Sequence, residues 1–267
     1  KQSCGTCKVL GSVKSNDLSR KVFKKKLTTY AAHQNLTVVG LSKWLATCAS
    51  KSTLFKKNKV VCLPNPIDTL IYSPLDKNIA RDLLRLPKNK KLVLFGALGA
   101  TSDPRKGYKE LCEALLQLKE QDIELVVFGS SKPKISEDFK FNTHYLGQLH
   151  DDVTLRALYS AADVMVVPSK QEAFGQTASE SMACGTPVVA FACTGLLDIV
   201  EHLKTGYLTK PYDTTDLATG IDWVLNAPNY DELSTNARNK VLNEFDSQVV
   251  AKQYIELYES VLEKAGI

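Results

Sequence analysis

The stretch Pro168-Ser169-Lys170-Gln171-Glu172-Ala173-Phe174-Gly175-Gln176-Thr177-Ala178-Ser179-Glu180 connects a short apolar run to a segment of small residues. The pattern predicts a strand before the stretch and a helix that begins within it, near Gly175. Two carboxylates, Glu172 and Glu180, therefore flank a glycine at the carboxyl end of a strand. In open parallel sheets, ligands bind at that end of the strands.

The start of this predicted helix is also suited to an anion. The backbone N–H groups of Phe174, Gly175, Gln176 and Thr177 are free donors there, and a helix N-terminus favours negative charge such as a diphosphate. An anion and a polyol could therefore be recognised together. The alternative is a surface loop with one solvated carboxylate and one carboxylate on a helix face.

Composition narrows the functional classes. The chain has 267 residues, of which 44% are hydrophobic and 24% charged, so it can form one large domain or two modest ones. A net charge of +5 is compatible with anionic ligands or an anionic membrane surface, but it does not indicate a nucleic-acid-binding protein. The sequence has neither a run of 18 apolar residues nor a signal peptide, which predicts a soluble, cytoplasmic chain.

The cysteines and histidines do not predict a complete metal site. Five cysteines lie mostly in apolar segments and are expected to be reduced core residues: Cys48, Cys62, Cys112, Cys184 and Cys193. Cys4 and Cys7 form a single C-x-x-C, which could be half of a zinc site, a redox pair or neither. The four histidines have no metal-ligand spacing, so no metal is expected.

The first 63 residues are expected to contain one strand-helix unit, preceded by a polar segment. A basic run could touch anionic lipid headgroups or be a solvated helix face: Arg20, Lys21, Lys24, Lys25 and Lys26. Residues 36–40 predict a strand, and Ser42 caps a helix that carries Trp44, Leu45, Cys48 and Leu54. Residues 60–63 then lead into Pro64-Asn65-Pro66-Ile67-Asp68, a stiff crossing between domains.

After that crossing, strand and helix patterns alternate. Short apolar runs occupy residues 92–95, 125–128, 145–146, 164–167, 188–191 and 207–208. Helical patterns fill the gaps, and further helices are expected at 213–226, 230–243 and 246–264. Six such runs predict an α/β fold, with a parallel, doubly wound sheet covered by helices on both faces.

A second candidate loop, residues 96–107, follows the first of these runs. It lacks both the G-x-G-x-x-G fingerprint and the G-K-[ST] ending of a P-loop, so neither nicotinamide binding nor ATP hydrolysis is indicated. Arg105 and Lys106 stand just before a helix, where they could neutralise a departing phosphate or simply be surface charge. Because this loop and the Glu172 loop both follow strands, we expect them to share one rim of the sheet.

Together these motifs resemble the nucleotide-binding half of family 4 glycosyltransferases, which have the GT-B fold. The resemblance covers about residues 36–265. It rests on E-A-F-G-Q-T-A-S-E from Glu172 to Glu180, on the segment Ala183 to Ala190, and on Ser42-Lys43-Trp44-Leu45 and Pro64 to Asp68. The joint match is specific, although each motif alone is weak.

The resemblance implies roles for individual residues. Lys106 would hold the donor diphosphate, with Arg105 as a second cation, and Glu180 would accept hydrogen bonds from the ribose hydroxyls. Glu172 would bind the transferred sugar with the help of the backbone at 174–176. The donor site would also include Thr177 and Gly96, and the base would lie against Gly129, Ser130, Gln148 and Leu149.

Two departures from the family pattern are visible. The family usually has an arginine after the glycine of the first strand, where this chain has Ala97, and Arg105 is our hypothesis for its replacement. Only about 60 residues precede the crossing, so the chain is expected to be a C-terminal fragment. Its expected parts are an N-terminal remnant (1–63), a Rossmann-like nucleotide-sugar domain (64–245) and a helix packing back toward the N-terminal part (246–267).

The resulting functional prediction is a retaining glycosyltransferase that moves a sugar from a nucleotide-sugar to an acceptor hydroxyl without a metal. By analogy with the family, the acceptor would be a glycan or a lipid-linked molecule in bacterial surface-polysaccharide synthesis at the inner face of the membrane. One alternative is a fragment that binds nucleotide-sugar without turnover. The other is a glycoside hydrolase with two carboxylates.

Overall fold

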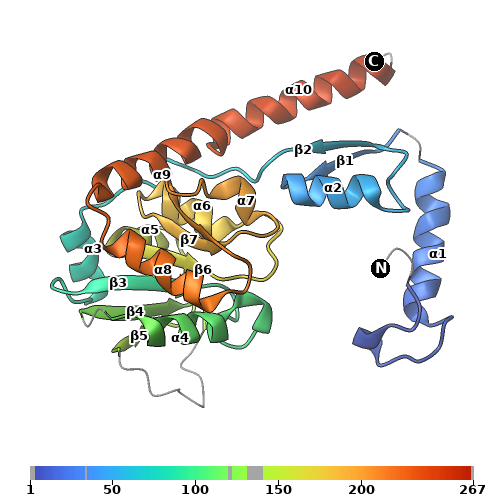
Figure 1. The fold of residues 1–267 in the computed structure, drawn as a ribbon. Helices are drawn as coiled ribbons and strands as arrows, with labels where there is room; N and C mark the ends of the chain where they lie inside the picture. Colours follow the sequence, from blue (N-terminus) through green and yellow to red (C-terminus); the bar gives the residue numbers. More distant parts are fainter. Residues whose placement is uncertain (1–3, 34, 120–121, 131–140, 266–267) are drawn as a thin grey trace. The chain divides into compact units, whose positions relative to one another are not determined.

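The computed structural model describes residues 4–33, 35–119, 122–130 and 141–265 of the chain (Figure 1). It divides into two compact units, Lys1–Pro64 and Asn65–Ile267. The division falls inside the proline-containing crossing, where two fixed backbone φ angles stiffen the chain. None of the described helices is long and apolar enough to span a membrane.

The first unit contains a two-stranded parallel sheet, in which β1 (Thr37–Gly40) pairs with β2 (Lys59–Cys62). The connecting helix α2 (Lys43–Lys51) begins as predicted, because the Ser42 hydroxyl accepts a hydrogen bond from the Leu45 amide. The prediction that this helix carries Leu54 is wrong. Ser52 has extended backbone angles and caps a separate turn by accepting from the Phe55 amide.

Two further helices precede this sheet, η1 (Lys8–Leu10) and α1 (Leu18–Ala31). Asp17 caps α1, and its pKa is lowered to about 2, chiefly by the hydrogen bond from Ser19. The basic run lies on α1 with its four lysines exposed, whereas Arg20 is half-buried and donates to the Cys4 carbonyl. The helix therefore presents a cationic surface.

Two of the five cysteines predicted to be core residues are not buried. Cys112 and Cys184 are buried and Cys193 is half-buried, whereas Cys48 and Cys62 are exposed. Cys48 and Cys62 belong to the first unit, where two short strands and one helix form too small a layer to bury them. An apolar sequence neighbourhood was therefore a poor guide to burial in that unit.

The second unit is built on a six-stranded, wholly parallel sheet in the order β5-β4-β3-β6-β7-β8. The strands are β3 (Lys91–Gly96), β4 (Ile123–Phe128), β5 (Thr143–Tyr145), β6 (Val164–Val167), β7 (Val188–Phe191) and β8 (Gly206–Thr209). The order reverses between β3 and β6. Such a reversal opens a crevice at the carboxyl ends of the two strands.

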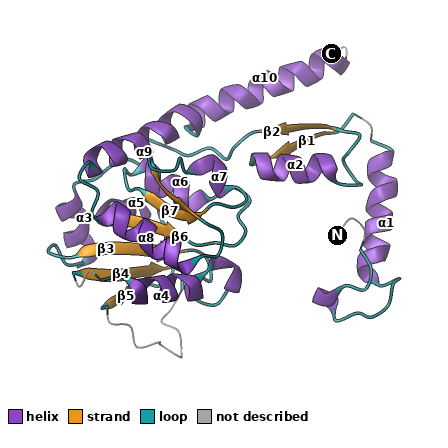
Figure 2. Cartoon of the chain, in the orientation of Figure 1, coloured by secondary structure: helices purple, strands orange, loops and turns teal. Residues whose placement is uncertain are grey.

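Helices cover both faces of this sheet, as Figure 2 shows. On one face, α4 (Tyr108–Gln117) and α8 (Thr214–Leu225) contribute Leu111, Leu115, Leu217 and Ile221 to one hydrophobic core with Val93. On the other face lie α5 (Asp152–Ala161) and α6 (Gln176–Ala183), with α3 (Lys77–Leu84) beside α5 and α9 (Tyr230–Glu244) beside α6. The predicted doubly wound architecture is confirmed.

The segment that enters this unit lies beside the residues that precede its last helix. Ile67 donates its N–H to the Phe245 carbonyl (2.7 Å) and accepts from the Ser247 N–H (2.9 Å), which gives a parallel bridge. Ser247 begins the long helix α10 (Ser247–Ala265), whereas the short helix α7 (Leu196–Ile199) follows β7. Whether α10 packs toward the N-terminal part stays a prediction.

Candidate functional site

Two loops meet at the carboxyl edge where the strand order reverses. The loop after β3 includes the short helix η2 (Pro104–Lys106), and the loop after β6 leads to α6. Gly107 has φ +76°, and a Cβ on it would lie 2.0 Å from the Pro168 carbonyl oxygen, so only glycine permits this approach. The Lys170 amide also donates to the Arg105 carbonyl at 2.8 Å. The two loops therefore form one rim.

The rim brings Lys106 and Glu172 together, as the sequence predicted. Lys106 Nζ lies 2.7 Å from Glu172 Oε1, and the side chains are 23% and 17% exposed. Among the described residues, none donates a hydrogen bond to Glu172 Oε2. The pair is thus partly desolvated, yet it keeps acceptor and donor capacity for a ligand.

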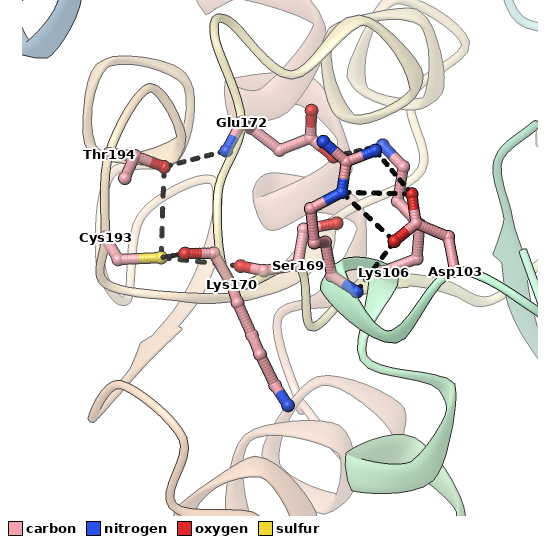
Figure 3. Close-up of polar contacts among 8 residues, drawn as sticks. Asp103, Lys106, Ser169, Lys170, Glu172, Cys193 and Thr194 are labelled. Carbon is pink, nitrogen blue, oxygen red and sulfur yellow. Dashed lines mark hydrogen bonds and ion pairs between the residues drawn. The ribbon is translucent and has the colours of Figure 1, made fainter. Parts of the chain in front are cut away.

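The backbone of Glu172 is held by residues after β7. Its N–H donates to Thr194 Oγ1 at 3.0 Å (Figure 3). Its carbonyl accepts from the Gly195 N–H, also at 3.0 Å. Cys193 Sγ lies 3.4 Å from the Ser169 carbonyl oxygen in the same loop. Sequence reasoning did not find Thr194, because no local pattern indicates a contact across 22 residues.

The amino end of α6 borders the same rim. Gly175 precedes the helix with φ +122°, and no described residue accepts a hydrogen bond from the backbone N–H groups at 174–177. The Phe174 side chain is 3% exposed and packs edge-on against Phe245. Its ring therefore belongs to the core, and only its backbone is available to a ligand.

Glu180 lies deeper than Glu172. It is 8% exposed, with Oε2 accepting from the Tyr159 hydroxyl (2.8 Å) and Oε1 from Gln176 Nε2 (3.0 Å). Burial raises the pKa of Glu180, and these two hydrogen bonds oppose the rise. Asn65 of the crossing donates in turn to Gln176 Oε1 at 3.4 Å. Binding of ribose by Glu180 stays a prediction.

Arg105 is placed differently from Lys106. Its guanidinium bonds Asp103 with Nη2–Oδ2 at 2.7 Å, and its side chain is 72% exposed. Hydrogen bonds from Arg105 lower the pKa of Asp103 to about 2. The described contacts of the Arg105 side chain are thus to Asp103 within its own loop, and its role toward a phosphate stays a prediction.

The predicted base-binding residues fall into two groups. Gly129 has φ +77° and packs against the Ala97 carbonyl, and Ser130 Oγ lies 2.6 Å from Thr101 Oγ1, so both contact the loop after β3. Gly96 ends β3 directly against the Phe128 ring. In contrast, Gln148 is exposed and Leu149 half-buried, and no described contact ties their side chains to the rim.

The site offers hydroxyl, carboxylate, amide and ammonium groups. Among the described residues there is no group of three or more His, Cys, Asp or Glu side chains that could hold a metal ion. Cys4, which is exposed, and Cys7, which is half-buried, are not part of such a group within the described part of the chain. The chemistry available is therefore hydrogen bonding to hydroxyls beside a cation and open backbone amides, which suits a phosphorylated polyol.

Comparison with known proteins agrees with this geometry. The family model for glycosyl transferases group 1 matches residues 76–240. An uncharacterized glycosyltransferase of Methanocaldococcus jannaschii is 30% identical over 96% of this chain and 67% of its own length. A D-inositol 3-phosphate glycosyltransferase of Xylanimonas cellulosilytica is 38% identical over 58% of this chain and 40% of its own length.

Solved structures show the same fold. A sucrose-phosphate synthase from Thermosynechococcus elongatus superposes with a TM-score of 0.75 at 27% identity, covering 98% of this chain and 67% of that one. The Anabaena protein HepE, solved with UDP and glucose, gives a TM-score of 0.68 at 22% identity, covering 88% of this chain and 67% of that one. The second unit thus has the fold of a GT-B half.

The chain belongs to the group 1 glycosyltransferase family, whose members are transferase enzymes. It spans about two thirds of the Methanocaldococcus jannaschii relative and about two fifths of the Xylanimonas cellulosilytica one.

Proposed function

We propose that this chain binds a nucleotide-diphosphate-sugar at the carboxyl edge between β3 and β6, and takes part in its retaining transfer to an acceptor hydroxyl. The observation that carries the proposal is the 2.7 Å contact of Lys106 with Glu172 beside the open amides of α6. A cation, a carboxylate acceptor and free N–H donors converge there. These are the groups that a diphosphate joined to a sugar requires.

Each of these groups binds a different part of the donor. Lys106 and the amides at 174–177 hold the diphosphate, and Glu172 Oε2 accepts from the sugar hydroxyls. Glu180 accepts from the ribose through oxygens that now bond Tyr159 and Gln176. The base lies against the tight turn at Gly129 and Ser130, with Gln148 and Leu149 farther along the chain. The HepE structure with UDP and glucose supports a donor of this class.

The chemical step needs charge stabilisation more than a nucleophile. As the bond from sugar to phosphate breaks, the sugar becomes oxocarbenium-like and negative charge grows on the diphosphate. Fixed donors aimed at that charge lower the barrier by electrostatics. Lys106 and the α6 amides are such donors, so we propose that no metal is required. Glu172 positions the sugar through its hydroxyls.

The acceptor side is proposed from the first unit and the family. The exposed lysines of α1 form a cationic surface that can contact anionic headgroups. A glycan or lipid-linked acceptor at the inner face of a membrane, as in surface-polysaccharide synthesis, fits that surface. Binding of α1 to vesicles with and without anionic lipid tests this part.

Donor binding is tested by calorimetry with a panel of nucleoside diphosphates and nucleotide-sugars. Lys106→Ala should weaken diphosphate affinity by about 10-fold or more, because one charge-assisted contact is lost. The matched control is Lys109→Ala, since Lys109 is exposed on α4 and its ion pair among the described residues is with Glu113. Equal affinities of both variants and the wild type would remove Lys106 from the site.

Arg105→Ala in the same panel decides whether this arginine replaces the one absent at Ala97. A drop in donor affinity supports the replacement, and unchanged affinity and turnover exclude it. Turnover is followed by product analysis with nucleotide-sugar and acceptor, with and without a chelator. Binding without turnover would favour the binding-only alternative, and release of sugar from a plain glycoside would favour a hydrolase.

A further inference from the structure

Thr194 has an unusual backbone conformation for its residue type. Its φ is +53°, in the left-handed region, where a β-branched side chain crowds the backbone. Residues held in this way persist only where the surroundings over-determine them, and they cluster at functional sites. Thr194 follows β7, at the same edge of the sheet as Glu172.

The turn at Thr194 and Gly195 holds the backbone of Glu172. The Thr194 hydroxyl accepts from the Glu172 N–H, and the next residue, Gly195, donates its N–H to the Glu172 carbonyl, both at 3.0 Å. Gly195 packs so closely that a Cβ would lie 2.7 Å from the Phe174 carbonyl oxygen. Two consecutive residues therefore hold both peptide groups of Glu172, whose side chain contacts Lys106.

Cys193 links Thr194 to the loop that carries Glu172. The Thr194 hydroxyl donates toward Cys193 Sγ at 3.9 Å, and the thiol donates to the carbonyls of Ser169 (3.4 Å) and Lys170 (3.7 Å). Burial raises the pKa of the Cys193 thiol, which keeps it protonated and able to donate. Figure 3 shows these contacts running from Glu172 through Thr194 and Cys193 to the loop.

We infer that Thr194 is a positioning residue, whose hydroxyl in a left-handed turn fixes the backbone of Glu172 and so the place of its carboxylate beside Lys106. Glycine would relieve the backbone strain at this position, but it has no hydroxyl to accept the Glu172 N–H. The consequence for turnover rests on the proposed function. The consequence for the Glu172 amide does not.

The experiment compares Thr194→Val, which is nearly isosteric but lacks the hydroxyl, with Thr194→Ser, which keeps it. The valine variant should lower kcat by about 10-fold, because a misplaced reacting group loses orientation, with donor KM within about 2-fold. The serine variant should restore most of kcat. Thr219→Val is the matched control, since the Thr219 hydroxyl donates to Thr215 on the exposed side of α8.

Amide hydrogen exchange of Glu172, resolved by NMR, gives a readout without turnover. Exchange should be faster in Thr194→Val than in the wild type and slow again in Thr194→Ser. Thr194→Ala replaces the valine variant in both measurements if the latter does not fold. Unchanged exchange and kcat without the hydroxyl, or equal losses in the serine and valine variants, would overturn the inference. A wild-type protein that transfers no sugar would refute only the proposed function.

Discussion

Ion pairs lie at both ends of β3 and β6, and they differ in how many of their hydrogen-bonding groups already have partners. At the amino ends, Asp163 contacts Lys77 Nζ, Arg81 Nη2 and the Leu92 N–H, each at 2.7 Å, and Arg81 is 4% exposed. At the carboxyl ends, the Lys106 and Glu172 side chains are 23% and 17% exposed, and Glu172 Oε2 accepts a hydrogen bond from none of the described residues.

The difference separates scaffold from site. The Arg81 guanidinium also donates to the carbonyls of Ala161 (2.9 Å), Lys88 and Lys90 (both 3.1 Å), so its hydrogen-bonding groups are largely used. A charge with all its partners in place stabilises the fold and has nothing left for a ligand. The Lys106–Glu172 pair keeps that capacity.

Removing Arg81 from its pair with Asp163 should have the largest effect on stability. Arg81→Ala leaves Asp163 and three carbonyls without the guanidinium, and we expect the free energy of unfolding to fall by about 3–5 kcal/mol. Urea unfolding measures this. The matched control is Lys88→Ala, whose exposed pair with Asp82 should contribute less than about 1 kcal/mol. Equal stability of the two variants would contradict the assignment of Arg81 to the scaffold.

Removing the charge of Glu172 from its pair with Lys106 should affect turnover more than stability. Glu172→Gln keeps the shape but removes the charge, and we expect kcat to fall about 100-fold, or about 2.7 kcal/mol in the barrier. The same variant should lower the free energy of unfolding less than Arg81→Ala does, because one described donor, Lys106, contacts the Glu172 carboxylate, whereas the Arg81 guanidinium has four partners. Steady-state kinetics and urea unfolding on one preparation decide this. A large stability loss without a kinetic effect would place Glu172 in the scaffold.

A smaller effect is expected for Glu180, which is buried and hydrogen-bonded but is also proposed to bind the ribose. Burial raises its pKa in the folded protein, so the folded state binds its proton more tightly than the unfolded state does. The contribution of Glu180 to stability is therefore greatest below its ordinary pKa of 4.5, and it is lost as the pH rises through the raised value. Glu180→Gln lacks this titration.

The test is urea unfolding of both proteins across acidic to neutral pH. The stability of Glu180→Gln relative to the wild type should increase from pH 4 upward and then level off. A constant difference would mean that Glu180 titrates normally. If Glu180 also binds ribose, the variant should weaken nucleotide binding at neutral pH more than it lowers kcat, which is the reverse of Glu172→Gln.

Much of the second unit could be predicted from the sequence, for a physical reason. Strands β6 and β7 are buried on both faces, so they appear as continuous apolar runs with the predicted bounds, 164–167 and 188–191. The meeting of Lys106 with Glu172 was also predictable, because parallel strands direct the loops at their carboxyl ends to one edge.

Other features depend on information that a local pattern does not contain. The hydrogen bond from Tyr159 to Glu180 spans 21 residues, and the contact of Thr194 with Glu172 depends on a left-handed backbone that a threonine rarely adopts. The exposure of Cys48 depends on how much structure surrounds its helix. Each is a tertiary property, set by elements that pack from elsewhere in the chain.

The bridge between Ile67 and Asp246 has a consequence for protein engineering. Because the segment that enters the six-stranded unit runs beside Asp246, just before α10, a version of the unit that ends before α10 can be spliced into a host protein or closed by a short linker without stretching the chain. New termini opened in an exposed turn on the far side would then give a circular permutant with the same sheet. The rim that holds Lys106 and Glu172 is thereby portable as a module.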